Sequence, residues 1–377
     1  MRILVVDITG SVTNYCSYLC EALTKQLEKG DDLLFSGPLP FLNNTCKNRK
    51  LFNFGASKYK GVLKWWQRKL KILEGVLNYL YVLHIVKKVK PDIIHFQSLP
   101  LLEYNNSDAF FLKKIRRGGK RKLLYTHHSL YPHNIEEGNK EVYRKRFLKA
   151  FEQLNAIIVH TKYDERTLVD EFCIPLAKIR IISQGMFEPK GYLRTTVNRN
   201  DGQTRFLMFG IQSEYKGTDI FIEAIACIPE EKRKEMSFRI VGKTDSLFFD
   251  KYQDKASILG IEWVPRAVSD ETLYSEIIAA DVIVFPYREI SLSGALLLAI
   301  FFNKRIIPSD IPSFRETLVG FKPGWFFESE NAQSMADLMI RHLDKQVFYS
   351  EIEIIRSLKK SYSWEKTSHN TLTAYMM

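Results

Sequence analysis

The sequence predicts an α/β protein built from two doubly wound parallel-sheet domains, and three observations support this class. The chain has 377 residues, which is long for one domain and sufficient for two. In both halves, short β-branched apolar runs alternate with helical patterns, as is typical of parallel sheets covered by helices. Between the halves, residues 188–204 lose hydrophobic periodicity and gather Gly, Asn and Thr, which indicates a linker. We expect domains over residues 1–190 and 203–361, followed by a helix over 362–377.

The predicted strands are short apolar runs without the polar alternation of a half-exposed strand. The first run, residues 2–7, leads into a loop that contains Gly10 and then into a helical pattern that Gly30 closes. Further strands of the first half are predicted at residues 91–96, 122–126, 156–160 and 178–182. Those of the second half are predicted at residues 205–209, 237–241, 261–264, 282–285 and 304–307. Ligands of such sheets bind outside the carboxyl ends of the strands, so a site in a cleft between the two domains is expected.

Composition excludes several classes of protein. With 45% hydrophobic and 26% charged residues, the chain is expected to fold rather than to remain disordered. No apolar run reaches the ~18 residues that a spanning helix needs, and residues 1–6 are too short for a signal peptide. The protein is therefore expected in the cytosol. Five cysteines without a CxxC pair predict neither a disulfide framework nor a zinc site.

Positive charge is concentrated in one region of the chain. Residues 41–150 contain 24 Lys and Arg but only seven Asp and Glu, whereas the whole chain carries a net charge of +12. This surplus suggests an anionic membrane, a nucleic acid or a phosphorylated substrate as partner. Within residues 58–72, cations interleave with tryptophan, as in a segment that lies in a membrane interface. The predicted membrane face comprises Lys64, Trp65, Trp66, Arg68 and Lys69.

Two other interpretations of this basic region remain open. A nucleic-acid partner would share the charge, but no zinc finger, recognition helix or RNA-binding aromatic signature accompanies it, so no nucleic acid is expected. A simple solvated cationic face would also have this composition.

Two loops of the second half carry residues suited to binding a diphosphate. The first, residues 210–217, follows a strand and places Gly210 and Lys216 where backbone N–H groups and an ammonium can meet a phosphate. The second follows the strand at 282–285 and leads into an apolar helix with free N–H groups. Its candidate residues are Arg288, Glu289, Ser291, Ser293, Gly294 and Ala295, with Glu289 free to accept sugar hydroxyls. Taken singly, these features are also typical of an ordinary turn, a helix cap and a solvated carboxylate.

Three histidines, His127, His128 and His133, follow the predicted strand at 122–126. One buried and two surface histidines would be an equally good interpretation. A metal site is not expected, because these spacings lack carboxylate or thiol partners.

The second half resembles the C-terminal domain of GT-B glycosyltransferases of family 4, which transfer sugars from nucleotide donors. The shared motifs are Tyr215-Lys216-Gly217, the strand at 280–286, Ser293-Gly294 and residues 303–310. In the first half, residues 156–161 and 178–185 resemble the family's last strand of the N-terminal domain. Residues 363–366 are similar to the start of the closing helix that crosses back onto that domain.

The resemblance implies two Rossmann-like domains facing a cleft, and a metal-independent, retaining transfer to a lipid-linked glycan in surface-polysaccharide synthesis. It places the enzyme at the inner face of the cell membrane. The donor diphosphate would be bound by the candidates above together with Gly10, and neutralised by Lys216 and the helix that starts at Gly294. His128 would touch the donor sugar, and His133 would lie on the acceptor side. Neither a cofactor nor a protein nucleophile is expected, since in retaining relatives the departing phosphate assists the incoming hydroxyl.

The sequence departs from the family pattern at two places. Gln212 and Ser213 stand where an arginine is usual before the loop lysine. The second of two glutamates, which grips the ribose in relatives, is missing, because the position paired with Glu289 is Leu297, or Ala299 when Gly294 is aligned. The alternatives are therefore an epimerase or phosphorylase on the same fold, and a catalytically impaired subunit that binds a partner.

Overall fold

The structure is a computed structural model that describes residues 1–40, 46–54, 64–128, 131, 137–189, 202–290, 292–344 and 349–377. The chain forms two compact units. Unit 1 comprises Met1–Gly185 with Trp364–Met377, and unit 2 comprises Met186–Ser363. Most of the predicted linker, residues 190–201, lies outside the described residues.

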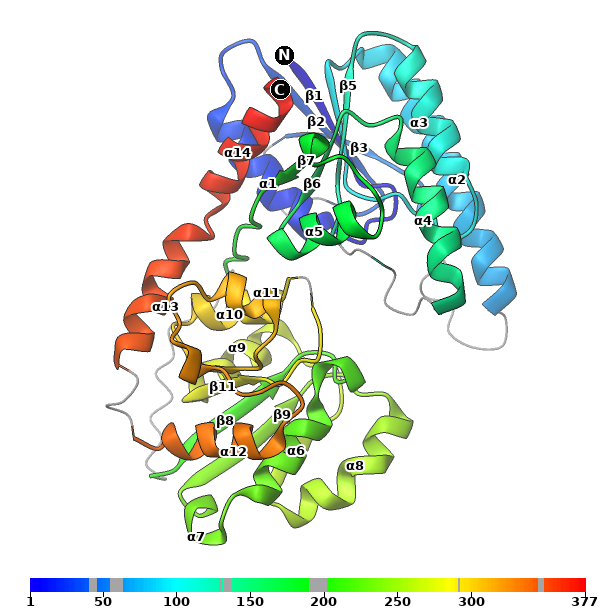
Figure 1. Ribbon diagram of the computed structural model, residues 1–377. Helices are drawn as coiled ribbons and strands as arrows, with labels where there is room; N and C mark the ends of the chain where they lie inside the picture. Colours follow the sequence, from blue (N-terminus) through cyan, green and yellow to red (C-terminus); the bar gives the residue numbers. More distant parts are fainter. Residues whose placement is uncertain are drawn as a thin grey trace. The chain divides into compact units, whose positions relative to one another are not determined.

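Unit 1 contains a seven-stranded parallel sheet in the order β3-β2-β1-β4-β5-β6-β7 (Figure 1). The strands are β1 Arg2–Val6, β2 Asp32–Gly37, β3 Lys47–Lys50, β4 Ile93–Phe96, β5 Lys122–Thr126, β6 Ala156–Val159 and β7 Ile179–Ile181. The central strand β1 is buried from Ile3 to Val6, as a strand covered on both faces must be. The strand order reverses between β1 and β4, which pair directly with Ile3 opposite Ile93.

The helices of unit 1 cover both faces of this sheet. They are α1 Thr13–Gln26, α2 Lys64–Val89, α3 Ser107–Arg117, α4 Glu137–Phe151, α5 Lys162–Asp170 and α14 Trp364–Met376, with a 3-10 turn at Leu176–Lys178. Figure 1 shows α2, α3 and α4 on one face and the pair α1 and α14 on the other. Gln26 donates hydrogen bonds to the Glu365 carbonyl at 2.8 Å and to Ser368 at 2.6 Å, which ties α14 to α1. Among the helices of the described residues, none is both long and apolar enough to cross a membrane.

Unit 2 contains a five-stranded parallel sheet in the order β10-β9-β8-β11-β12. The strands are β8 Thr204–Phe209, β9 Met236–Val241, β10 Ile261–Val264, β11 Val282–Phe285 and β12 Arg305–Pro308. The helices are α6 Thr218–Cys227, α7 Glu230–Arg233, α8 Ser246–Ile258, α9 Asp270–Ala279, α10 Gly294–Phe301, α11 Pro312–Thr317, α12 Ala332–Arg341 and α13 Tyr349–Ser361. Two 3-10 turns, η2 Glu214–Lys216 and η3 Pro323–Trp325, complete the unit. In Figure 1, α6, α8 and α12 cover one face of the sheet, and α9 and α10 the other.

The predicted α/β class with two doubly wound parallel sheets is confirmed, and each predicted strand is present within one or two residues of its expected bounds. Two differences have physical reasons. The first helix ends at Gln26 and not near Gly30, because Leu27 adopts extended backbone angles. The strands β2 and β3 were not predicted, and β3 consists of Lys47-Asn-Arg-Lys50, whose four side chains are all exposed. An edge strand of this kind has no apolar pattern and uses charge to discourage pairing with another chain.

Candidate active site

The two predicted diphosphate loops meet where the strand order of unit 2 reverses. Strands β8 and β11 pair directly, so the loops that follow them start side by side. Gly217 has a φ of +69°, and a Cβ at this position would lie 1.8 Å from the Pro286 carbonyl oxygen. The Arg288 N–H donates to the Tyr215 carbonyl at 2.9 Å. Glycine at 217 therefore allows the two loops to contact each other through their backbones.

Lys216 lies at the centre of this contact. Its side chain is nearly buried, and Nζ donates a hydrogen bond to the Tyr287 hydroxyl at 2.8 Å. The same ammonium lies 3.9 Å from the centre of the Tyr287 ring. Burial lowers the pKa of Lys216 to about 8. Most of the lysine is therefore charged at pH 7, and this charge has little water to screen it.

Tyr287 joins Lys216 to the start of α10. The Ser293 side chain lies near Tyr287, where it partly offsets the rise in the pKa of Tyr287 that burial causes, and it caps α10 by accepting from the Leu296 N–H at 3.2 Å. Gly294 is exposed, and no heavy atom lies within 4 Å of where its Cβ would be, while Ala295 is half-buried. A buried ammonium and the positive end of a helix dipole thus come together beside open space.

Arg288 is part of an ion pair within unit 2. Its guanidinium donates to both carboxylate oxygens of Asp219, at 3.0 and 2.7 Å, and to the Glu214 carbonyl. The Asp219 hydrogen bond raises the pKa of Arg288. Arg288 thereby fastens the loop after β11 to the turn η2, which carries Lys216, and to the first turn of α6. A role of Arg288 in donor binding remains a prediction.

Gln212 and Gly210 shape the loop before the lysine. Gln212 is buried, donates to the Gly210 carbonyl at 2.8 Å and accepts from Thr218 at 2.8 Å. Gly210 has a φ of +107°, and a Cβ at Gly242 would lie 1.8 Å from its carbonyl oxygen. The residue at the position of the family's arginine is thus a bridge between the loop and α6.

The other candidates of the second loop differ in how far the structure describes them. Glu289 is exposed and makes no hydrogen bond or ion pair with the part of the chain that the structure describes. Ser291 lies outside the described residues. Leu297 and Ala299, the two positions considered for a second glutamate, are both buried in α10.

In unit 1, His128 belongs to a polar cluster at the carboxyl ends of neighbouring strands. Its Nε2 lies 3.0 Å from the Gln97 carboxamide and its Nδ1 lies 3.4 Å from Nε2 of His160. The Tyr15 ring packs edge-on against it, with centroids 4.7 Å apart. Burial, with a smaller contribution from His160, lowers the pKa of His128 well below its usual range. His128 is therefore neutral at pH 7.

The neighbouring histidines occupy different environments. His127 is buried, stacks on Phe147 with centroids 5.0 Å apart and contacts the Tyr125 hydroxyl through Nδ1 at 3.1 Å. His128 is only half-buried, so of this pair it is the one that a ligand can reach. His133 lies outside the described residues.

Asp7 organises the loop that contains Gly10. The carboxylate is completely buried just past β1, accepts from the Gly10 N–H at 3.0 Å and from Ser98 at 3.0 Å, and also contacts Thr13 at 3.2 Å. Burial raises the pKa of Asp7, and these hydrogen bonds oppose that effect. Gly10 has a φ of +74°, which suits glycine.

Sequence reasoning missed four residues of these clusters, namely Asp7, Gln97, His160 and Tyr287. Each stands within two residues after the end of a buried strand, and this position is the signal that could have identified them.

The predicted membrane face lies at the start of α2. Trp66, Arg68 and Lys69 are exposed, and Nζ of Lys69 lies 5.8 Å from the centre of the Trp66 ring. The side chains of Lys64 and Trp65, and residues 58–63 of the predicted stretch, lie outside the described residues.

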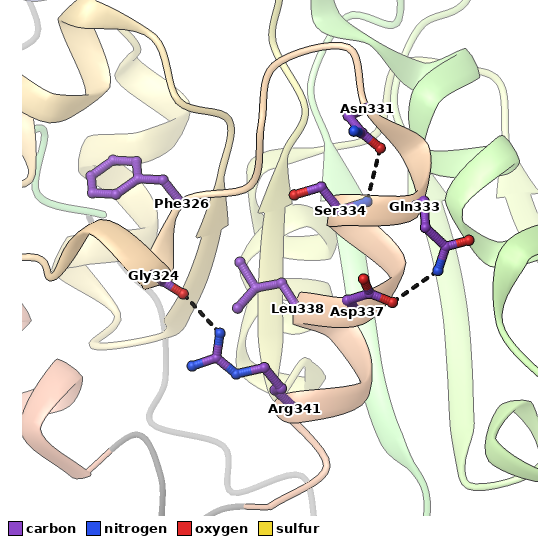
Figure 2. A pocket seen from close by; sticks show the side chains of 8 residues that line it. All are labelled: Gly324, Phe326, Asn331, Gln333, Ser334, Asp337, Leu338 and Arg341. Carbon is purple, nitrogen blue, oxygen red and sulfur yellow. Dashed lines mark hydrogen bonds between the residues drawn. The ribbon is translucent and has the colours of Figure 1, made fainter.

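A cavity of about 320 Å³ in unit 2 contains none of the predicted residues. Figure 2 shows that its polar groups bind one another: Asn331 caps the Ser334 N–H at 3.0 Å, and Arg341 donates to the Gly324 carbonyl at 3.0 Å. Among the described residues, no three His, Cys, Asp or Glu side chains gather closely enough to hold a metal ion.

Two family models match the chain, one in each half. The model described as Glycosyltransferase Family 4 matches residues 47–186, and the model described as Glycosyl transferases group 1 matches residues 203–345. The first match lies within unit 1 except for its last residue, Met186, and the second lies within unit 2 and includes both diphosphate loops. No curated protein matches the sequence.

Solved structures share the fold over the full length of the chain. A glycosyltransferase from Rickettsia africae is 18% identical with a TM-score of 0.70, and the match covers 99% of this chain and 97% of that one. Sucrose-phosphate synthase from Thermosynechococcus elongatus is 16% identical with a TM-score of 0.73, covering 100% and 98%. The Anabaena protein HepE, solved with UDP-glucose, is 12% identical with a TM-score of 0.69, covering 100% of both chains.

The two parallel-sheet units and these matches define a GT-B glycosyltransferase, an enzyme of class EC 2.4. Within that class, the chain belongs to the family 4-like glycosyltransferases.

Proposed function

We propose that this enzyme transfers a sugar from a nucleotide-diphosphate donor whose diphosphate binds in unit 2, between Lys216 and the start of α10. The observation that carries the proposal is the buried Lys216 ammonium, which donates to the Tyr287 hydroxyl near the Ser293 cap of α10. The Anabaena relative solved with UDP and with UDP-glucose supports this class of donor. A screen of UDP-, GDP- and dTDP-sugars identifies the sugar and the base of the donor.

Charge complementarity explains how the leaving group is stabilised. A nucleoside diphosphate gains negative charge as the sugar departs, and a poorly hydrated ammonium beside a helix N-terminus stabilises that charge without reorganising. We expect no metal to be required, because the lysine and the helix dipole supply the positive charge. Gly210, Ser291 and Ala295 would line the same site, and Gly10 would contact the donor from unit 1.

We further propose that His128 and Glu289 act on the donor sugar and that the reaction retains anomeric configuration. Glu289 is exposed, so its carboxylate can accept hydrogen bonds from sugar hydroxyls. The neutral His128 can form a hydrogen bond with a further sugar hydroxyl. No protein nucleophile is proposed, since the departing phosphate can take the proton of the incoming hydroxyl. His133 is proposed for the acceptor side.

A catalytically impaired, partner-binding subunit is the second candidate. The observation that favours it is the apolar burial of Leu297 and Ala299, which leaves no second glutamate to grip a ribose. Turnover separates the two: Glu289→Gln and His128→Ala should each lower sugar transfer far more than they lower the melting temperature. Full activity in both variants would show that neither side chain serves the reaction, whereas a wild-type protein that binds the diphosphate without turnover would favour the impaired subunit.

Donor binding is tested by calorimetric titration with UDP, GDP and dTDP. Lys216→Ala should weaken the best of these ligands by roughly 1.5–3 kcal/mol, the value of a charge-assisted contact, while the protein stays folded. Lys232→Ala is the matched control, because Lys232 is exposed and pairs with Glu235. It lies in α7, just before the amino end of β9, whereas the diphosphate loops follow the carboxyl ends of their strands. Unchanged affinity in Lys216→Ala would remove this lysine from the site.

We also propose a lipid-linked glycan as acceptor, with the enzyme peripheral at the anionic inner face of the membrane in surface-polysaccharide synthesis. The support is an apolar stripe on α2 formed by Trp66, Leu73 and Leu80, which are 56, 51 and 50% exposed. Their spacing of seven residues places them on one face of the helix. Lys69 and Lys87 flank this stripe, as in helices that lie in a membrane interface.

Vesicle binding tests the membrane proposal. Wild-type protein should bind anionic vesicles, with about 1 kcal/mol from each cation near the surface, and should keep part of this binding in high salt through its apolar side chains. Changing Trp66, Leu73 and Leu80 to Ala should remove the salt-resistant part. The control changes Leu247 and Ile258 of unit 2, which are 79 and 86% exposed. If the wild type ignores anionic vesicles at low salt, the face is merely solvated and the acceptor is soluble.

A further inference from the structure

A chain of hydrogen bonds begins at the C-terminal helix of the protein and runs toward His128. The Tyr375 hydroxyl of α14 lies 2.7 Å from Nδ1 of His95, which is completely buried on β4. On the other side of the His95 ring, Nε2 lies 2.7 Å from the Thr126 hydroxyl and 3.1 Å from the Gln97 carboxamide. Both nitrogens of this buried histidine are thus engaged.

The chain continues from Gln97 through two further histidines. The carboxamide of Gln97 lies 3.0 Å from Nε2 of His128, whose Nδ1 lies 3.4 Å from Nε2 of His160. Nδ1 of His160 lies 2.9 Å from the Ile182 carbonyl oxygen. All of these groups belong to unit 1, on β4 and α14 and at the carboxyl ends of β4, β5, β6 and β7.

The hydrogen bond to the Ile182 carbonyl, at the end of this series of hydrogen bonds, fixes which histidine nitrogens carry a proton. A carbonyl oxygen can only accept, so Nδ1 of His160 carries a proton and donates it. Burial lowers the pKa of His160 to about 4, so its ring is neutral at pH 7 and Nε2 has a lone pair. The facing Nδ1 of His128 must then donate, which leaves a lone pair on Nε2 of His128.

The orientation of the Gln97 carboxamide follows from this assignment. Its NH2 group faces His128 and its oxygen faces His95, because Nε2 of His128 needs a donor. The structure places the oxygen toward His128, but this orientation leaves two lone pairs facing each other unless His128 or His160 is charged. Nitrogen and oxygen of an amide have the same shape, so the pattern of donors decides between them. His95 then donates its one Nε2 hydrogen to the Gln97 oxygen and the Thr126 hydroxyl oxygen together, in a bifurcated hydrogen bond, and accepts the Tyr375 hydroxyl hydrogen at Nδ1.

We infer that Tyr375 is a positioning residue for His128, acting through His95 and Gln97. The chain runs in one direction from the Tyr375 hydroxyl to the Ile182 carbonyl and holds His128 in the tautomer with its proton on Nδ1. In that tautomer Nε2 of His128 carries no proton, so it can meet a sugar hydroxyl only as an acceptor, with its lone pair shared with the Gln97 NH2 group or released by it. The inference rests on the proposed function in one respect, namely that His128 reaches the donor sugar.

The tautomers can be measured without any substrate, by long-range proton–nitrogen NMR correlations of protein labelled with ¹⁵N-histidine. His128→Asn identifies the signals of His128. Wild-type His128 should be one neutral tautomer protonated on Nδ1, and Tyr375→Phe, which removes only the hydroxyl, should give a mixture of tautomers. Gln97→Met interrupts the hydrogen-bond series in its middle and should give the same mixture of tautomers. It replaces Tyr375→Phe as the test if that variant does not fold. Tyr143→Phe, a buried tyrosine outside the chain, should leave the signals unchanged. A proton on Nε2 of wild-type His128, or unchanged signals in the variants that break the chain, would overturn the inference.

Turnover of UDP-, GDP- and dTDP-sugars provides the second readout. Tyr375→Phe should lower kcat about two- to tenfold, the value of one neutral hydrogen bond, with the donor KM unchanged. Normal turnover in His128→Ala would reject the proposed role of His128 but leave the NMR result standing. A low rate in His128→Ala together with normal kcat in Tyr375→Phe would instead reject the role of Tyr375.

Discussion

The Tyr287 hydroxyl accepts a hydrogen bond from the Lys216 ammonium at 2.8 Å, and the Tyr287 ring lies under the same ammonium at 3.9 Å. One tyrosine therefore contacts the cation twice, through its hydroxyl and its ring face. This relationship holds a buried charge in place before any anion binds. The loss of that charge with rising pH should be visible in the pH dependence of anion binding.

Binding of UDP should depend on pH through Lys216. The pKa of this lysine is about 8 in the free protein, so its positive charge is lost as the pH rises through 8. Affinity should be nearly constant from pH 7 to 7.5 and fall by up to about tenfold per pH unit above 8. Lys216→Arg keeps its charge at all these pH values and should bind UDP with a flat profile. Parallel profiles for the two proteins in calorimetry would contradict this assignment.

Removal of the Tyr287 hydroxyl should weaken the site and shift its pH profile. Tyr287→Phe deletes the acceptor for the Lys216 ammonium, which leaves the charged form with fewer stabilising contacts and lowers the pKa of Lys216 further. UDP affinity at pH 7 should drop by about 0.5–1.5 kcal/mol, and the decline with pH should begin below 8. Tyr274→Phe, which changes a half-buried tyrosine of α9, serves as control. An unshifted profile would argue against the coupling of Tyr287 to Lys216.

The ion pair between Arg288 and Asp219 should stabilise unit 2. Two parallel hydrogen bonds in a partly buried position are worth about 1–2 kcal/mol, so Asp219→Asn should lower the free energy of unfolding by that amount. UDP affinity should fall as well, because Arg288, whose guanidinium also donates to the Glu214 carbonyl of η2, is held less firmly. Denaturant unfolding and calorimetry on the same variant check both effects. A stability equal to that of the wild type would show that the pair is dispensable.

Glu351 should make the stability of unit 2 fall with rising pH. Its carboxyl is buried beside Arg305, and burial raises its pKa to about 8. The folded state keeps a proton that the unfolded state releases near the usual pKa of 4.5, so stability is lost between pH 4.5 and 8. Glu351→Gln retains an oxygen for the Ile306 N–H, which Glu351 binds at 2.6 Å, but carries no charge.

The difference in unfolding free energy between Glu351→Gln and wild type should therefore grow from pH 5 to pH 8 by up to about 1.4 kcal/mol per unit. Comparing the two proteins cancels the opposite trend from the buried histidines of unit 1, whose stability contribution is lost as the pH falls below 6.5. A constant difference would mean that Glu351 stays ionised in the folded protein.

Apart from β2 and β3, the strands of both sheets were predicted, because buried parallel strands are apolar on both faces. Residues 122–126, for example, form β5 with the expected bounds. The loops carrying Lys216 and Ser293 were predictable for the same reason, since each follows such a strand. β3 escaped prediction because Lys47-Asn-Arg-Lys50 has four exposed polar side chains and no apolar pattern.

The partners of the site residues could not be predicted, since they depend on strand order and on contacts between distant segments. His95 and Tyr375 are separated by 280 residues, and no local pattern links them. The Arg288–Asp219 pair likewise joins the loop after β11 to the first turn of α6, 69 residues away in the sequence. By contrast, the apolar stripe on α2 was visible in principle: Trp66, Leu73 and Leu80 repeat every seven residues, but the predicted segment ended at residue 72.

The placement of α14 in unit 1 determines the order in which the protein can be completed on the ribosome. Unit 2 is one continuous segment, whereas unit 1 needs residues 364–377, which are synthesised after all of unit 2. Because domains fold as they emerge, unit 2 can mature while His95 still lacks Tyr375 and α1 still exposes the surface that α14 covers. A chain that ends at Ser363 and has been released from the ribosome should therefore contain a protease-resistant unit 2 and a protease-sensitive unit 1.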